Sequence, residues 1–223
     1  MTHHIKWIAL AAVLSCAGAA HAQSAGSWAA RVGATQIDPQ VDSGDLSAPS
    51  LSGTKADVKS ATQLSGGVTY MVTDHVAIDV PLALPFKHDL EGAGAIAGVG
   101  KIGEVKALPI TVMAQYRFLD PAAALRPYLA AGPTYAKFFK ARSTATLSGI
   151  TGGTPANPTT LTVDSKLAAT FGAGASYRLN PHCFVDASVS KTFLKTRTTL
   201  STGQTLDIKL DPIAISLAVG YRF

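Results

Sequence analysis

The side chains best suited to build a polar site recur at one end of several alternating segments. Each lies between apolar neighbours, and together they are Arg31, Asp79, Gln115, Arg117, Arg178, Asp186 and Arg222. Guanidinium and carboxylate groups that meet away from water form ion pairs with charge-assisted hydrogen bonds. The pattern therefore predicts a salt-bridged plug. One interpretation is a floor that blocks a straight aqueous path, and the other is that buried charges pair simply because isolation is costly.

A second set of residues offers apolar surface at the opposite end of the same segments. It comprises Pro85, Phe86, Leu90, Phe138, Phe139 and Leu210, with Leu147 and Ile213 nearby. One interpretation is an apolar rim that accepts hydrophobic solutes and begins a substrate path. The other is that loops pack against the rim of the fold.

The sequence contains no convincing motif for catalysis or metal binding. Residues 98–103 match the G-x-G-x-x-G spacing, but they follow a loop and precede a strand, so no helix N-terminus is there to hold a phosphate. His75, His88 and His182 are far apart in the sequence and lack metal-ligand spacing. No G-x-S-x-G or H-E-x-x-H motif occurs. We expect no metal, no cofactor and no enzymatic activity.

The elements that must position these residues are β-strands, because apolar residues alternate with small or polar ones. Alternating segments span residues 27–37, 61–72, 75–84, 105–118, 126–140, 163–178, 182–196 and 206–223. Their connections alternate between short (73–74, 119–125 and 179–181) and long (38–60, 85–104, 141–162 and 197–205). This pattern predicts an all-β fold, an eight-stranded antiparallel transmembrane β-barrel with short periplasmic turns and long extracellular loops.

The aromatic residues agree with that topology. Outward parity and a position near the expected periplasmic strand ends are shared by Trp28, Tyr70, Tyr116, Phe118, Tyr177, Tyr221 and Phe223. They predict an interfacial girdle. Pro81 and Pro133 lie inside predicted strands, where the missing N–H interrupts a ladder, so we expect bulges there.

The start of the chain and its composition indicate export. Residues 1–22 resemble a signal peptide that ends at Ala20-His21-Ala22, which leaves 23–223 as the barrel. The alternative is a lipoprotein with Cys16 lipidated, because residues 13–16 resemble a lipobox. Charged residues make up only 15% of the chain, and its 19 Lys and Arg are dispersed rather than clustered, so we expect no nucleic-acid partner.

The chain resembles the OmpW family of small outer-membrane proteins, which includes AlkL-type alkane importers. The stretches that carry the resemblance are 28–39, 68–80, 84–90, 100–118, 125–139 and 206–223, and the most specific are GKIGEVKALPITVMAQYRF (100–118) and Arg126-Pro127-Tyr128. The resemblance implies location in the bacterial outer membrane and passage of small hydrophobic molecules through an apolar lumen with a lateral exit into the bilayer. Pro81 and Pro133 would then mark the lateral opening. Segment 141–162, which is rich in threonine and glycine, departs from the family pattern.

The partners expected from this resemblance are outer-membrane lipid, the barrel assembly machinery and small hydrophobic solutes. A passive channel is the leading hypothesis for function. The alternative is a structural or interaction barrel that acts through its extracellular loops as a receptor or adhesin. A lipid-modifying enzyme would need a Ser/His/acid set at the rim, and the sequence offers no convincing one.

Overall fold

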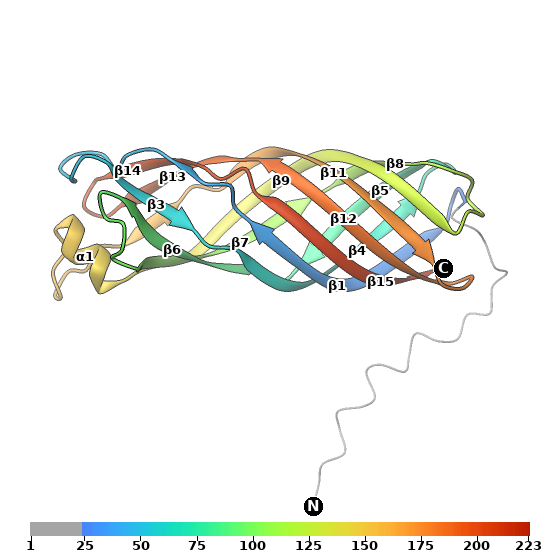
Figure 1. The fold of residues 1–223 in the computed structure, drawn as a ribbon, viewed down its shortest axis with the longest axis horizontal. Helices are drawn as coiled ribbons and strands as arrows, with labels where there is room; N and C mark the ends of the chain where they lie inside the picture. Colours follow the sequence, from blue (N-terminus) through green and yellow to red (C-terminus); the bar gives the residue numbers. More distant parts are fainter. Residues whose placement is uncertain (1–23) are drawn as a thin grey trace, which may run out of the picture.

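The computed structural model describes residues 24–223, which form a long closed barrel of antiparallel strands (Figure 1). The expected signal peptide and Cys16 lie outside the described residues. The eight strands of the wall, in order around the barrel, are β1 (Trp28–Asp38), β4 (Ala61–Met71), β5 (Val76–Ala83), β8 (Met113–Arg117), β9 (Leu125–Ser143), β11 (Lys166–Arg178), β12 (Cys183–Phe193) and β15 (Ile213–Arg222). The barrel closes because β15 pairs with β1 and β9 pairs with β11. The eight-stranded prediction is confirmed.

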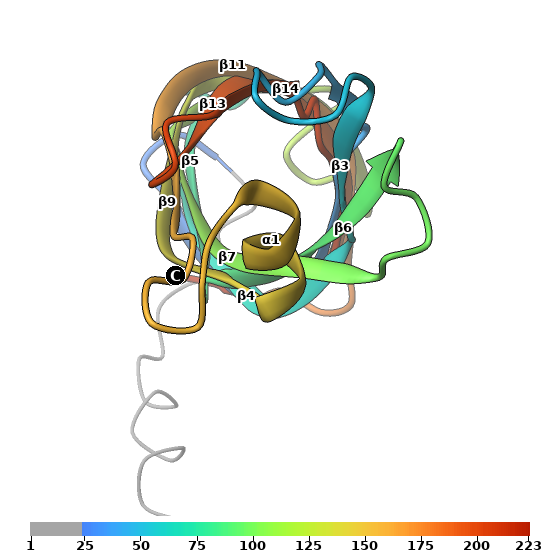
Figure 2. The same ribbon diagram turned by 90° about the vertical axis from the view of Figure 1, so that its left-hand side faces the viewer.

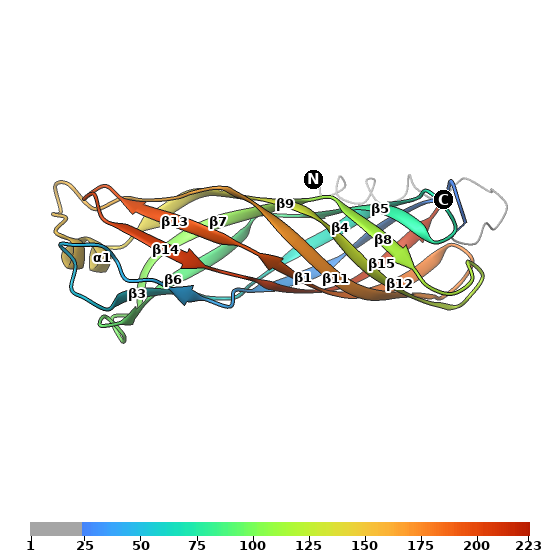
Figure 3. The same cartoon turned by 90° about the horizontal axis from the view of Figure 1, so that it is seen from above.

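The segments expected to be long loops instead contain ordered structure that extends the tube. The additional elements are β2 (Asp42–Ser43), β3 (Thr54–Val58), β6 (Phe86–Gly94), β7 (Lys101–Thr111), α1 (Ala145–Thr151), β10 (Leu161–Val163), β13 (Lys195–Leu200) and β14 (Thr205–Lys209). They lie at one end of the barrel, here called the loop end, opposite the C-terminus (Figures 1 and 3). The prediction of a loop over 85–104 was wrong, because β6 and β7 pair as a hairpin there.

The extension is held by an apolar core inside the tube. Buried residues from several of these elements gather there, among them Val58, Ile102, Leu161, Leu200, Leu206 and Ile208. The last predicted segment, 206–223, is in fact two strands, and its apolar residues change from even to odd positions where the two meet. β14 ends at Lys209, Asp211 adopts φ 33°, and β15 begins at Ile213. Leu206, Ile208 and Leu210 thus point into the extension, whereas Ile215 and Leu217 face outward.

The outer surface of the barrel wall is apolar, as alternation requires. Leu64, Leu129 and Leu217 are all more than half exposed. At the opposite end, here called the turn end, Trp28 packs on Tyr70 and Tyr221 on Phe223, which forms the expected aromatic girdle. Lys191 lies on the outer face with its ammonium 5.6 Å from the centroid of the Phe193 ring. Within residues 24–223 no helix is long and apolar enough to cross a membrane.

Candidate functional site in the lumen

A continuous cavity extends through the lumen from the loop end to a polar floor. Its upper lining is apolar and includes Leu90, Phe138, Leu194, Leu206 and Leu210. The helix α1 lies across the mouth (Figure 2), with Leu147 and Ile150 contributing to the lining. Thr144 caps this helix, since its Oγ1 accepts a hydrogen bond from the Leu147 amide at 3.3 Å.

The structure divides the residues predicted to form the apolar rim. Phe86, Leu90, Phe138 and Leu210 contribute to the cavity lining. Pro85 and Phe139 do not line it. Phe138 and Phe139 are adjacent on β9, so their side chains point to opposite faces of the strand. The outward position of Phe139 corrects the expectation that both rings face the lumen.

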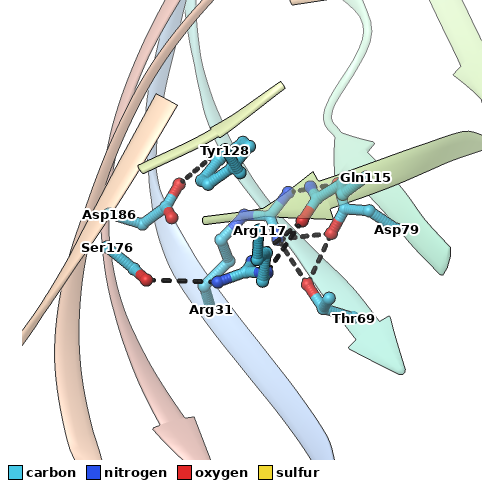
Figure 4. Close-up of polar contacts among 8 residues, drawn as sticks. All are labelled: Arg31, Thr69, Asp79, Gln115, Arg117, Tyr128, Ser176 and Asp186. Atoms are coloured by element: carbon cyan, nitrogen blue, oxygen red, sulfur yellow. Dashed lines mark hydrogen bonds and ion pairs between the residues drawn. The ribbon is translucent and has the colours of Figure 1, made fainter. Parts of the chain in front are cut away.

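The floor is built around a bidentate ion pair between Arg31 on β1 and Asp79 on β5 (Figure 4). The two N···O distances are 2.6 and 2.8 Å, and Thr69 Oγ1 donates a third hydrogen bond to Asp79 at 2.5 Å. Asp79 is almost completely buried. The pair joins two strands that flank β4, so it forms a polar bridge over β4 on the lumen side of the wall.

A second group of the floor comes from β8, β9, β11 and β12. Arg117 donates to Gln115 Oε1 at 2.9 Å and to Ser176 Oγ at 3.1 Å, and its guanidinium lies 4.8 Å from the centroid of the Tyr128 ring. Tyr128 donates to Asp186 Oδ1 at 2.9 Å. Tyr128 and Ser176 were not among the predicted site residues, although their inward parity on predicted strands was a signal for them.

The remaining predicted arginines lie nearer the turn end. The Arg222 guanidinium stacks over Phe184 at 4.9 Å, and its Nε has no hydrogen-bond partner among the described residues. Arg178 donates to the carbonyl of Ala122 in a turn, so it does not join the Arg31–Asp79 group. Arg126, which the sequence analysis did not select for the plug, is fully buried and donates to the carbonyls of Asp74 and Leu119.

Two glycines make room for the side chains of the floor. A Cβ at Gly67 would lie 2.8 Å from Nη2 of Arg31, and a Cβ at Gly174 would lie 2.5 Å from Cζ of Tyr128. Side-chain carbon atoms do not approach other atoms this closely. The absence of a side chain at these positions therefore lets the guanidinium pass over β4 to Asp79 and the phenol pass over β11 to Asp186.

The side wall has a gap between β5 and β7. The β5–β8 ladder ends at Asp79 opposite Met113, and pairing resumes only with β6 and β7 at Phe86 opposite Ala107. Residues 80–85 on one side and residues 108–112 on the other side are therefore not paired with each other. Leu82 on this stretch is 55% exposed on the outer face and also contributes to the cavity lining.

Three prolines border this gap on the edges that face it. In an antiparallel sheet, successive residues direct their backbone groups to alternate neighbouring strands. Leu84 donates to Leu64 on the β4 side, so Pro81 and Pro85 face the β7 side. Val112 donates to Pro133 on the β9 side, so Pro109 faces β5. None of the three prolines has an N–H to offer across the gap.

Pro133 lies elsewhere, in a part of the wall that is continuous. It pairs with Ala169 on β11, and its carbonyl accepts the Val112 amide at 3.2 Å on the other side. The neighbouring Thr134 is paired with Thr111 of β7. The expectation of a lateral opening at Pro133 is therefore corrected, and the gap has Pro81 on one side and Pro109 on the other.

Charged groups surround the loop-end extension beyond the apolar outer belt. Hydrogen bonds from Lys87 and Lys101 lower the pKa of Glu104 to about 2. Inside the same extension, burial lowers the pKa of His88, whose Nδ1 lies 2.7 Å from the carbonyl of Lys59. The outer surface thus changes from apolar to ionic between Leu84 and Lys87.

The exposed apolar belt, the aromatic girdle and the closed eight-stranded wall define a β-barrel protein of the bacterial outer membrane. The OmpW family profile matches residues 24–223. The chain belongs to the OmpW family.

Relatives support this assignment along the whole chain. "Outer membrane protein W" of Vibrio cholerae is 33% identical over 227 residues and covers 100% of both chains. "Outer membrane protein AlkL" of Ectopseudomonas oleovorans is 25% identical and covers 89% of this chain and 83% of its own. The crystal structure of OprG from Pseudomonas aeruginosa superposes with a TM-score of 0.80 at 27% identity, covering 91% of this chain and 99% of its own.

Proposed function

We propose that this protein is an outer-membrane channel for the passive uptake of small hydrophobic molecules. Solute enters the apolar lumen at the extracellular mouth and leaves sideways between β5 and β7 into the bilayer. The observation that carries this proposal is the unpaired stretch of wall at Pro81 and Pro109, which lies above the floor and within the apolar outer belt.

The polar floor supports a sideways route. Arg31 and Asp79 place an ion pair in the floor below the gap, and Arg117 and Tyr128 extend the polar floor toward β11 and β12. A hydrophobic solute loses its favourable surroundings on approaching these charges, whereas Leu82, Leu84 and Ile110 offer apolar contacts at the exit. The solute is therefore expected to move from the lumen toward the apolar gap and the bilayer rather than toward the charged floor.

The test is uptake into vesicles whose outer leaflet is lipopolysaccharide, with and without the protein. We expect accelerated uptake of a hydrophobic solute and no acceleration of a charged solute of similar size. The Pro81→Val/Pro109→Val variant restores two amide donors on the gap-facing edges and is expected to slow hydrophobic uptake. Pro133→Val, the same substitution in a paired part of the wall, is the matched control.

Unchanged uptake in the Pro81→Val/Pro109→Val variant would refute the lateral route. Absence of any acceleration by the folded wild-type protein would refute the channel itself. That second result would favour the interaction role, for which binding should depend on the loop-end segments and survive closure of the gap.

A further inference from the structure

The lumen carries a group of hydroxyl side chains beside the gap that the passage of hydrocarbon does not require. Thr35 on β1 lies 2.7 Å from both Ser65 on β4 and Ser216 on β15 through its Oγ1. Ser188 on β12 is the register partner of Ser216, and Ser190 follows on the same face. All five residues are half-buried and line the cavity, and they are called the hydroxyl cluster below.

The position of the hydroxyl cluster connects it to the proposed exit. Ser65 is the register partner of Ala83, which lies on the edge of the gap. Thr35 is four residues from Arg31 on the same face of β1, so it lies above the ionic floor by roughly 13 Å along the strand. The apolar upper part of the cavity, lined by Leu194, Leu206 and Leu210 and called the apolar chamber below, lies on the other side of the hydroxyl cluster.

The hydrogen-bonding capacity of the cluster is not used up within the protein. Thr35, Ser65 and Ser216 have three hydroxyl hydrogens, and the two bonds among them use two. The side-chain hydroxyls of Ser188 and Ser190 make no hydrogen bond within residues 24–223. Donors and acceptors therefore face the cavity, without a charged side chain in the cluster itself.

A second chain of hydroxyls in the same wall shows the contrast. Thr134 lies between Thr111 and Thr170, at 2.8 and 2.6 Å, and Thr170 continues to Thr192 at 2.8 Å. Thr134 has a relative exposure of only 2%. Thr134 and Thr35 each join two neighbouring hydroxyls, but only Thr35 keeps substantial exposed surface.

From these observations we infer that the hydroxyl cluster binds the head group of a neutral amphiphile, a medium-chain aliphatic alcohol, while its chain lies in the apolar chamber. This inference rests on the proposed channel function and narrows its substrate class. A hydroxyl transferred into an apolar lumen is penalised unless it finds a partner. The hydroxyl cluster supplies that partner at the level of the exit, so an alcohol is accepted where an otherwise apolar lumen would favour the alkane.

The experiment compares initial uptake rates of 1-octanol and n-octane in the vesicle assay. Loss of one neutral hydrogen bond corresponds to about fivefold in rate or affinity. Thr35→Val and, separately, Ser188→Ala are each expected to reduce the octanol-to-octane ratio about fivefold while octane uptake stays unchanged. Thr134→Val is the matched control and should keep the wild-type ratio. Thr35→Ser restores a hydroxyl and should restore the ratio.

The outcomes separate this inference from the proposed function. If wild-type protein accelerates octane and neither Thr35→Val nor Ser188→Ala changes the ratio, the head-group site is wrong and the channel stands. An equal change in Thr134→Val would also overturn the site, because it would show a general effect of hydroxyl loss on the wall. If neither solute is accelerated by folded wild-type protein, both proposals fail. Ser188→Ala removes no intramolecular hydrogen bond, so it keeps the test independent of folding.

Discussion

The ion pair in the floor gives a quantitative prediction for barrel stability. In Asp79→Leu the Arg31 guanidinium loses two short hydrogen bonds while staying mostly buried, and in Arg31→Met the Asp79 carboxylate keeps only Thr69. Breaking a buried pair by removing one partner costs about 3–5 kcal/mol, whereas replacing both partners by apolar residues is often neutral. Asp186 also attracts Arg31, so we expect about 3 kcal/mol for Asp79→Leu.

The double variant Arg31→Met/Asp79→Leu should therefore be more stable than the sum of the two single changes predicts. We expect a coupling free energy of about 2 kcal/mol or more, since residues that share a buried ion pair are not additive. The assay is urea unfolding in lipid vesicles. The slope of the unfolding free energy against urea concentration should be the same for the wild type, the two single variants and the double variant.

Arg178→Met is the control for loss of a guanidinium. Its hydrogen bond to Ala122 lies in a half-exposed turn, so a cost below about 1 kcal/mol is expected. Additive single effects, or costs at Asp79 no greater than at Arg178, would show that water solvates the floor and would refute the description of a buried bridge. In the double variant, ion leakage should also rise while octane uptake stays unchanged.

Three further predictions address the floor and the loop end. Gly174→Val should destabilise the barrel by about 1–3 kcal/mol through overpacking against Tyr128, and urea unfolding of Gly174→Val with and without Tyr128→Leu would show relief if the clash is the cause. Burial lowers the pKa of His88, so the unfolded protein binds more protons at this residue than the folded protein does, and acidification below about pH 6.5 should weaken the extension. Hydrogen exchange in β6 should then accelerate, and His88→Phe should abolish this pH dependence. The lowered pKa of Glu104, about 2, means that its ion pairs stabilise above its ordinary pKa and are lost as pH falls toward 2; an NMR titration of its carboxyl group near pH 4.5 rather than 2 would contradict the pairing.

The wall could be predicted because each of its strands has one face toward lipid and one toward a crowded lumen. Period-2 alternation around Val76, Ile110 and Leu217 therefore gives both the element and its sidedness. The same rule placed Arg31, Asp79 and Asp186 inside. It did not give their partners, because which inward residues meet depends on the stagger between strands, and a stagger cannot be read from one strand.

The loop-end extension was missed for a different physical reason. In β6 the outward residues Lys87 and Asp89 are charged because this part of the wall faces water, so the segment lacks the apolar outer face by which a membrane strand is recognised. Its inward residues Phe86, His88 and Leu90 do alternate with them. Short length and nearby glycines outweighed that signal, whereas the long-range pairing with β3 and β7 stabilises the strand in the fold.

The prolines at the gap solve a problem that any lateral opening in a membrane wall creates. Backbone N–H groups without partners are costly at membrane depth, where no water replaces the missing strand. Pro81, Pro85 and Pro109 all lie on gap-facing edges, so three donors that separation would leave unpaired do not exist. Proline thus makes an open wall less unfavourable as well as making a closed ladder weaker. A proline such as Pro133, which lies beside a paired strand, has only the second effect. Position on the strand edge, rather than proline content, is therefore the feature on which the proposed exit rests.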